Sequence, residues 1–321
     1  MLKAGIIGCG GIAQAHAQGY KTTGKADLVG FYDVENQKAE DYAQEFGGKA
    51  FASAEELLGG QTIDVASICT PPSSHENLAC TAMQNGVHVI CEKPLAHTSQ
   101  SARVMCQCAA DTGMLLVTAY KFRFFANVLW AKTLLDEGKL GKVVFARNIF
   151  AGQIDMSDRW FSKKEISGGG VMLDNGVHSI DLLRFLFGEV DGVFAVARNA
   201  GQPMEVEDSC RLMLNMSSSI WASVDLSWVA GQSQNILEIH GTDGLVELWW
   251  NGGSFVPKSG EPSEFTPPND PVAADPFAAE LDWFMACVRG EKKPRATAED
   301  GLKALEVIDR AYACAQSPPW R

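Results

Sequence analysis

The sequence lacks several features that would identify major classes of protein. Its 321 residues contain no run of about 18 consecutive apolar residues, which argues against an ordinary membrane-spanning helix. No Cys-x-x-Cys pair occurs among the nine scattered cysteines, and we interpret them as reduced thiols. A Gly-x-Ser-x-Gly elbow and a Gly-x-x-x-x-Gly-Lys-Ser/Thr loop are also absent, so serine hydrolases and P-loop nucleotide hydrolases are not supported.

Positive charge is scarce as well. The chain has 27 Lys and Arg against 39 Asp and Glu, a formal net charge of −12, and no basic cluster offsets the excess. The electrostatic field of this excess negative charge repels polyanions, so we expect no nucleic-acid partner. The N-terminus enters a strand pattern directly, without the apolar stretch of a signal peptide, and we therefore expect a cytoplasmic protein with no membrane partner.

The first part of the chain alternates between strands and helices. Apolar runs at 2–8, 26–33, 63–70, 87–91 and 114–120 are separated by helical patterns, with Gly and Pro at the junctions. This alternation predicts an α/β fold, a doubly wound parallel Rossmann sheet covered on both faces. Ligands of such sheets bind beyond the carboxyl ends of the strands.

The second part of the chain is built differently. Helical patterns at 126–138 and 171–187 accompany strand patterns that follow one another without intervening helices. Asp243-Gly244 between two of these strand patterns predicts a hairpin. We therefore predict a dinucleotide-binding domain over 1–119 and a second α/β domain, with an open, mostly antiparallel sheet, over 120–321.

A glycine-rich turn follows the first strand. Residues 8–13, GCGGIA, match the pattern G-x-G-x-x-G/A, so Gly8, Gly10, Gly11 and Ile12 are expected to hold a pyrophosphate at a helix N-terminus. Asp33 ends the second strand, 20 residues past Ala13. A carboxylate there would accept hydrogen bonds from ribose hydroxyls and repel a 2′-phosphate, which favours NAD over NADP.

Three further segments carry candidate chemistry. Thr70 ends the strand at 63–70 and is followed by Pro71 and His75, and Glu92-Lys93-Pro94 follows the strand at 87–91. Both segments stand where a cofactor would lie across the sheet edge, so we expect Thr70, Pro71, His75, Glu92 and Lys93 to bind it. A lysine ammonium at such a strand end would stabilise alkoxide charge on a substrate oxygen. On the 171–187 helix, Asp174 and His178 share one face, an arrangement suited to general acid–base catalysis. One Asp–His pair falls short of a metal ligand set, so no metal is expected.

These segments together resemble the glucose–fructose oxidoreductase / inositol dehydrogenase / rhizopine-catabolism (Gfo/Idh/MocA) family over essentially the whole chain. The matching pieces are GCGGIA at 8–13, Asp33, CTPPSSH at 69–75, CEKP at 91–94, FRF at 122–124, LGKV at 140–143, GGGVMLDNGVHSIDLLRFLFG at 168–188 and GEKKPRATAEDGLKALEVIDRAY at 290–312. The Glu-Lys-Pro and Asp-x-Gly-x-His motifs are more specific than the glycine turn.

The resemblance implies a function and a set of site residues. It implies an NAD-dependent oxidoreductase that acts on a sugar, a cyclitol or a related polyol, in a homo-oligomer, dimer or tetramer, formed through the second domain. Lys93, Asp174 and His178 match the family's catalytic residues, and we expect Arg123 and Trp160 to contact substrate with them. Two alternatives remain open at this point: an NAD-dependent glycoside hydrolase that oxidises its sugar transiently, and a non-catalytic dinucleotide sensor.

Overall fold

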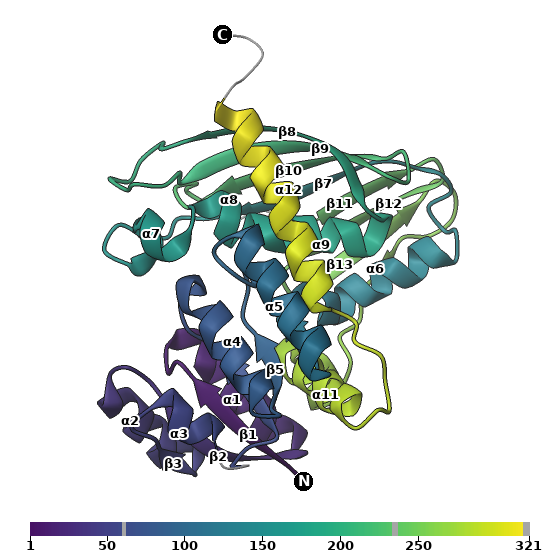
Figure 1. The fold of residues 1–321 in the computed structure, drawn as a ribbon. Helices are drawn as coiled ribbons and strands as arrows, with labels where there is room; N and C mark the ends of the chain where they lie inside the picture. Colours follow the sequence, from purple (N-terminus) through teal and green to yellow (C-terminus); the bar gives the residue numbers. More distant parts are fainter. Residues whose placement is uncertain (60–61, 233–236, 317–321) are drawn as a thin grey trace. The chain divides into compact units, whose positions relative to one another are not determined.

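The structure is a computed structural model that describes residues 1–59, 62–232 and 237–316. The chain forms two compact units, the first of residues 1–124 and 269–302, the second of residues 125–268 and the segment from 303 onward (Figure 1). Within the described residues, no helix combines the length and the apolar character that a membrane span requires.

The first unit contains a six-stranded parallel sheet in the order β3-β2-β1-β4-β5-β6. Its strands are β1 (Leu2–Ile7), β2 (Ala26–Tyr32), β3 (Lys49–Ala50), β4 (Val65–Ile68), β5 (His88–Cys91) and β6 (Leu116–Thr118). The central strand β4 is buried along its whole length, as expected for a parallel strand with helices on both faces. The carboxyl ends of all six strands therefore meet at one edge of the sheet.

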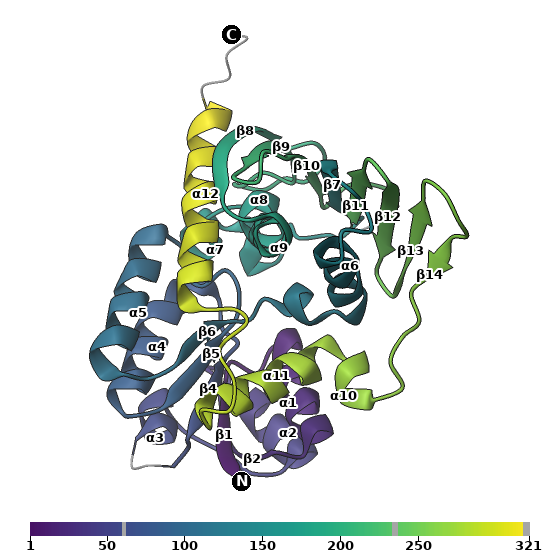
Figure 2. The ribbon, with the colours of Figure 1, turned by 90° about the vertical axis from the view of Figure 1, so that its right-hand side faces the viewer.

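Helices cover both faces of this sheet. Figure 2 shows α4 and α5 on one face and α1 and α11 on the other. The helices of the unit are α1 (Gly11–Thr23), α2 (Asn36–Phe46), α3 (Ala54–Leu58), η1 (Pro72–Ser74), α4 (His75–Gln84), α5 (Ser99–Thr112), η2 (Lys121–Phe124), α10 (Pro271–Ala274) and α11 (Pro276–Val288). Leu281 and Phe284 of α11 are buried in one cluster with Tyr20 of α1 and Phe31 of β2. This packing places residues 269–302 in the first unit, although they are distant in sequence.

The second unit contains an eight-stranded sheet in the order β14-β13-β12-β11-β7-β10-β9-β8. Its strands are β7 (Val143–Ala151), β8 (Val190–Arg198), β9 (Ser209–Met216), β10 (Trp221–Ser227), β11 (Leu237–Gly241), β12 (Gly244–Trp249), β13 (Gly252–Pro257) and β14 (Ser263–Glu264). Only the β7–β10 pair is parallel among these described strands. Buried residues alternate with exposed residues along β9 and mostly with half-buried residues along β10, so one face is covered and the other is open.

The helices of the second unit lie on the covered face of this sheet (Figure 2). They are α6 (Ala126–Asp136), η3 (Trp160–Ser162), α7 (Lys164–Ser167), α8 (Val171–Asp174) and α9 (Gly176–Phe187). The last helix, α12 (Ala298–Gln316), begins in the first unit and continues in the second. It docks on the sheet through the Arg310 guanidinium, whose Nη2 donates to the Val190 carbonyl at 2.7 Å.

The predicted fold class is confirmed, and some details differ. The hairpin at Asp243-Gly244 forms as predicted, between β11 and β12. The single helix predicted over 171–187 is instead two helices, α8 and α9, which meet at Asn175. The assignment of cofactor binding to residues 1–119 and of substrate binding to residues 120–321 stays a prediction, because compactness alone does not assign a function to a unit.

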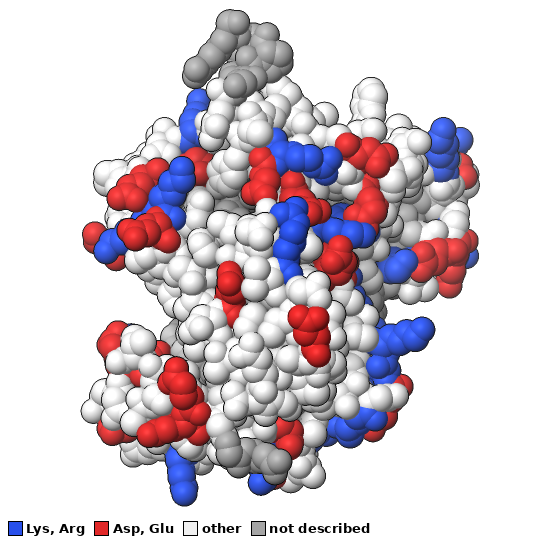
Figure 3. Space-filling view, viewed as in Figure 1, with Lys and Arg blue, Asp and Glu red and all other residues white. Residues whose placement is uncertain are grey.

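Acidic side chains gather over α2 and α3 of the first unit (Figure 3). The exposed members of this group are Glu35, Glu40, Asp41, Glu45, Glu55 and Glu56. Lys38 is among them, and its ammonium pairs with Glu35 at 2.6 Å. A negative surface of this kind disfavours a polyanionic partner at this part of the molecule.

Candidate active site

The glycine turn joins β1 to α1 and requires its first glycine for two reasons. Gly8 has φ of +88°, and a Cβ there would lie 2.7 Å from the Cys69 carbonyl oxygen after β4. A Cβ on Gly10 or Gly11 would meet no atom within 4 Å. Gly10 is the N-cap of α1 and supplies no side-chain cap, and its flank is open. The N-terminus of α1 is thus suited to receive an anionic group.

Asp33 holds this turn from the neighbouring strand end. Its Oδ2 accepts a 2.7 Å hydrogen bond from the Cys9 backbone N–H, and its Oδ1 accepts one of 2.9 Å from the Glu35 N–H. A carboxylate oxygen can accept more than one hydrogen bond, so Asp33 retains capacity for ribose hydroxyls. Burial, followed by the charge of Asp33, raises the pKa of the Cys9 thiol to about 12, which keeps it neutral.

His75 lies behind the same sheet edge. It is fully buried, with Nε2 2.8 Å from the Thr70 carbonyl oxygen and Nδ1 3.1 Å from the Pro94 carbonyl oxygen. Burial is the main cause that lowers the pKa of this imidazole. His75 therefore links the segment after β4 to the segment after β5. Its predicted part in cofactor binding, like those of Thr70 and Pro71, stays a prediction.

A buried polar network supports the Glu92-Lys93-Pro94 turn after β5. The Glu92 Oε1 lies 3.1 Å from His16 Nε2, and its Oε2 accepts a hydrogen bond from the Lys93 backbone N–H at 3.1 Å. His16 Nδ1 contacts the Ser67 hydroxyl at 3.1 Å, and that hydroxyl also contacts Tyr20 Oη at 3.0 Å. The network spans β4, β5 and α1 and fixes the backbone from which the Lys93 side chain extends.

The ionisation of Glu92 reflects two opposed effects. Burial alone would raise its pKa, but the hydrogen bond and charge of His16, with the charges of Lys93 and Lys121, outweigh burial and lower the pKa. A charged carboxylate is therefore held inside the unit. The Lys121 ammonium lies 4.9 Å from the ring centroid of Phe277 on α11, which keeps a second cation near this edge.

In the second unit, Asp174 and His178 are carried by the α8–α9 segment. Asp174 ends α8 and is half-buried, whereas His178 lies in the first turns of α9 with only 4% of its surface exposed. The His178 ring lies 6.3 Å from the Phe150 ring of β7. Asp181, one turn further along α9, is buried as well, and Arg184 Nη1 is 4.0 Å from its Oδ1.

Glu207, which precedes β9, caps α8 from outside the helix. Its Oε1 accepts hydrogen bonds from the N–H groups of Gly170 at 3.1 Å and Met172 at 3.0 Å, and its carbonyl oxygen accepts one from Val171 at 3.0 Å. A Cβ on Gly170 would overlap that carbonyl. Tyr312 of α12 donates to the same Oε1 at 2.8 Å. One residue thus satisfies three successive amides at the start of the segment that carries Asp174.

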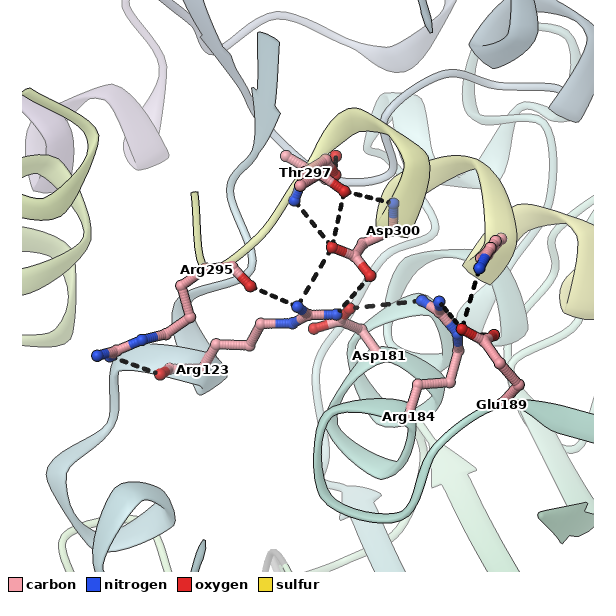
Figure 4. Close-up of polar contacts among 9 residues, drawn as sticks. Arg123, Asp181, Arg184, Glu189, Arg295, Thr297 and Asp300 are labelled. Carbon is pink, nitrogen blue, oxygen red and sulfur yellow. Dashed lines mark hydrogen bonds and ion pairs between the residues drawn. The ribbon is translucent and has the colours of Figure 1, made fainter. Parts of the chain in front are cut away.

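Arg123 and Trp160 lie in surroundings that the sequence did not indicate. Arg123 is buried within the first unit, where its Nη2 pairs with Asp300 Oδ1 at 3.0 Å and its Nη1 donates to the Arg295 carbonyl oxygen (Figure 4). These contacts give Arg123 a structural role at the start of α12. Trp160 of η3 stacks on Phe161 with ring centroids 3.7 Å apart. The predicted contacts of both with substrate stay predictions.

Glu189 forms ion pairs with two cations at the C-terminal end of α9 (Figure 4). Arg184 Nε donates to Glu189 Oε2 at 2.9 Å, and Lys303 Nζ donates to Glu189 Oε1 at 3.1 Å. The hydrogen bond with Arg184 is the first cause that lowers the pKa of the Glu189 carboxyl. Both ends of the segment with Asp174 and His178 are therefore fixed by glutamates from elsewhere in the second unit.

Sequence reasoning did not identify Glu207, Tyr312 or the partner of Glu92. Glu207 and Tyr312 are 105 residues apart; Glu207 belongs to none of the motifs, and Tyr312 ends the segment 290–312 without any sign of a polar partner. His16 gave no signal beyond its position in the helix after the glycine turn. No group of three or more His, Cys, Asp or Glu suited to a metal ion occurs among the residues that the structure describes.

Two family models match the chain. Residues 2–120 match the model described as an oxidoreductase family with an NAD-binding Rossmann fold, and residues 128–247 match the GFO/IDH/MocA C-terminal domain. Together they cover the sheet edge with Lys93 and the segment with His178.

Curated relatives cover nearly the whole chain. 1,5-Anhydro-D-fructose reductase of Ensifer adhaerens is 30% identical, covering 95% of this chain and 93% of its own. D-Apiose dehydrogenase of Paraburkholderia graminis is 25% identical and covers 98% and 88%, respectively. Inositol 2-dehydrogenase of Rhizobium meliloti is 25% identical and covers 97% and 96%.

Solved structures share the fold. A levoglucosan dehydrogenase in complex with NADH superposes with a TM-score of 0.91 at 23% identity, covering 98% of this chain and 97% of its own. An aldose-aldose oxidoreductase from Caulobacter crescentus, complexed with glycerol, gives a TM-score of 0.90 at 25% identity with the same coverage. The likeness to the first structure concerns the fold alone.

Proposed function

Because this chain belongs to the GFO/IDH/MocA family of NAD-binding oxidoreductases, we propose that it transfers a hydride between nicotinamide and a hydroxyl-bearing carbon of a sugar, a cyclitol or a related polyol. The observation that carries the proposal is the position of Lys93. Its backbone is fixed at the carboxyl end of β5, in the same parallel sheet whose β1 ends in the open glycine turn. The reductase and dehydrogenase names of the relatives give no support to a glycoside hydrolase or a sensor.

The residues at the first sheet edge fit NAD. The N-terminus of α1 has no side-chain cap and is flanked by two glycines whose missing Cβ atoms leave open space, as a pyrophosphate requires. Asp33 stands at the end of β2 with its orientation fixed by two backbone amides. We therefore assign the pyrophosphate to the turn of residues 8–13 and the adenosine ribose to Asp33. When bound, NAD supplies the acceptor for the hydride.

The protein's own groups would handle the proton and the oxygen. We propose that His178 accepts the hydroxyl proton as general base and that Asp174 assists it. The Lys93 ammonium would hydrogen-bond the same oxygen and stabilise its developing charge. Burial of His178 excludes bulk water from the imidazole, which strengthens its interaction with a neighbouring charge.

We further propose that the protein is cytoplasmic and forms a homo-oligomer through the open face of the eight-stranded sheet. On that face, Trp221 is 68% exposed and pairs across strands with Phe145, which is 43% exposed. Phe145 stacks on His240 of β11 with ring centroids 4.2 Å apart. Leu245 and Val256 continue the row across β12 and β13. A continuous apolar row of this kind is typical of a protein–protein interface.

The test is NADH production from a panel of inositols, aldoses and sugar acids. We expect at least one of these compounds to be oxidised, with Lys93→Ala and His178→Ala each lowering turnover by at least ~100-fold while NAD still binds. Lys132→Ala, which removes an α6 lysine paired with Asp136, is the matched control and should keep wild-type turnover. Near-normal turnover in the Lys93 or His178 variant would remove that residue from the mechanism.

A further inference from the structure

An aromatic row extends from the His178 imidazole to the surface of the second unit. The Phe150 ring of β7 lies 6.3 Å from His178, and the Trp250 ring lies 6.4 Å from Phe150. Phe125 meets Trp250 edge to face, with ring centroids 5.5 Å apart. All four residues belong to the second unit, so these distances describe one compact body. The row thus begins at the proposed general base, passes through the large exposed indole of Trp250 and ends at the buried Phe125.

Trp250 is exposed but held in place. It is 47% exposed, an unusual state for a tryptophan, whose large apolar surface gains most from burial. It stands in the turn between β12 and β13, where Asn127 Nδ2 donates 2.9 Å hydrogen bonds to the carbonyl oxygens of both Trp249 and Gly252. The Phe125 ring packs against the indole at an interplanar angle of 79° and restrains it from one side. The indole is therefore a fixed apolar surface rather than a loose side chain.

We propose that the Trp250 indole, with the Phe150 ring inclined to it at 52°, forms a stacking platform that binds the ring of a cyclic sugar or cyclitol and presents one of its hydroxyls to His178. The inference rests on the proposed function and narrows its substrate class. A saturated six-membered ring with equatorial hydroxyls has flat C–H faces that lie well on an aromatic surface. An open-chain polyol presents no such face. Ring-form substrates should therefore be favoured over linear polyols.

A ring on this platform would be recognised at two places. Its C–H face lies on the aromatic surface, and the hydroxyls on its rim remain free to bond polar groups. Specificity for the ring thus comes from Trp250, whereas the choice of the reacting carbon comes from the groups around His178. Loss of the indole should accordingly weaken substrate binding more than it slows the chemical step.

The test compares Trp250→Ala with Trp250→Phe in the full-length protein with NAD. The ring probes are myo-inositol and methyl β-D-glucopyranoside, and the linear probe is sorbitol. We expect Trp250→Ala to raise KM for an oxidised ring probe by about 5- to 10-fold with kcat within about 2-fold, and Trp250→Phe to restore most of the affinity. KM and kcat for sorbitol should be the same in the wild-type protein and in both variants. Trp249→Ala is the matched control, since Trp249 is 42% exposed and lies next in the chain.

Binding of methyl β-D-glucopyranoside, measured by saturation-transfer NMR in the presence of NADH, separates this inference from the proposed function. Binding that is lost in Trp250→Ala supports the platform even where no probe is oxidised, an outcome that would count against the function. An unchanged KM and unchanged binding in Trp250→Ala, with turnover still dependent on His178, would overturn the platform and leave the function intact. Absence of ring binding by the wild-type protein, or equal effects on sorbitol, would also overturn it.

Discussion

Tyr312 Oη donates a 2.8 Å hydrogen bond to the Glu207 carboxylate, and the same carboxylate oxygen accepts the backbone N–H groups of Gly170 and Met172. The relationship joins the last helix to the start of α8, the helix that ends at Asp174. Burial is the main cause that raises the pKa of the Glu207 carboxyl, although these hydrogen bonds oppose it. Here a carboxylate from another part of the chain takes the place of a local N-cap.

The first prediction concerns this cap. Glu207→Ala leaves buried amides without acceptors and should lower turnover by at least ~10-fold through displacement of Asp174 and His178, while the affinity for NAD stays unchanged. Glu207→Gln keeps an acceptor oxygen and should retain turnover within about 3-fold. Tyr312→Phe should cost about 1 kcal/mol of stability with little effect on turnover. Steady-state kinetics, NAD titration and thermal unfolding check these outcomes, and normal turnover in Glu207→Ala would contradict the assignment.

The second prediction concerns the choice of cofactor. Asp33→Asn keeps an acceptor for the Cys9 N–H but removes the charge that would repel a 2′-phosphate. We expect the ratio of kcat/KM for NADP to that for NAD to rise by about 10-fold or more. Asp33→Ser should raise NADP use as well, but it should also weaken binding of both cofactors because it loses the contact with Cys9. An unchanged ratio in both variants would show that the ribose lies elsewhere.

The third prediction concerns the ion pair between the buried Arg123 and the half-buried Asp300 at the start of α12. Asp300 accepts the Thr297 N–H at 2.9 Å and pairs with Arg123, and although burial opposes it, these contacts lower the pKa of the Asp300 carboxyl. Asp300→Asn should lower the free energy of unfolding of the first unit by about 2 to 3 kcal/mol at pH 7.

The difference in the free energy of unfolding between the wild-type protein and Asp300→Asn should change with pH in a definite direction. A carboxyl whose pKa is lowered on folding stabilises the protein above its ordinary value of 3.8 and loses this effect as the pH falls through the folded pKa. The gap between wild type and Asp300→Asn should therefore be constant above about pH 5 and shrink in more acidic solution. Urea unfolding between pH 7 and pH 3 measures it. A gap that widens on acidification would show that the pair does not stabilise the fold.

The fourth prediction concerns assembly. Trp221→Glu places a charge in the exposed row of the eight-stranded sheet and should convert the oligomer to a smaller species. Val104→Glu changes an exposed apolar residue of α5 in the first unit and serves as the control. Sedimentation velocity measures the size of the wild-type protein and of both variants. We expect only Trp221→Glu to sediment as a smaller species. A monomeric wild-type protein, or an unchanged size for Trp221→Glu, would exclude this face as the interface.

The sequence by itself determined the local features of this protein. These features are the periodicity of strands and helices, the glycine turn at residues 8–13 and the position of Asp33. Each depends on neighbours within a few tens of residues, so it can be recognised in the sequence alone. The two sheet types followed from whether helices separate the strands. The motifs around Lys93 and His178 likewise occupy short, continuous segments.

Only the tertiary structure decided which distant residues support those motifs. Glu207 caps α8, Trp250 reaches Phe150, and residues 269–302 pack in the first unit through contacts that leave no periodic pattern in the sequence. Arg123, whose contact with substrate stays a prediction, pairs with a carboxylate 177 residues away. Such partners are selected by packing and by the need to satisfy buried polar groups, and these requirements exist only once the chain has folded.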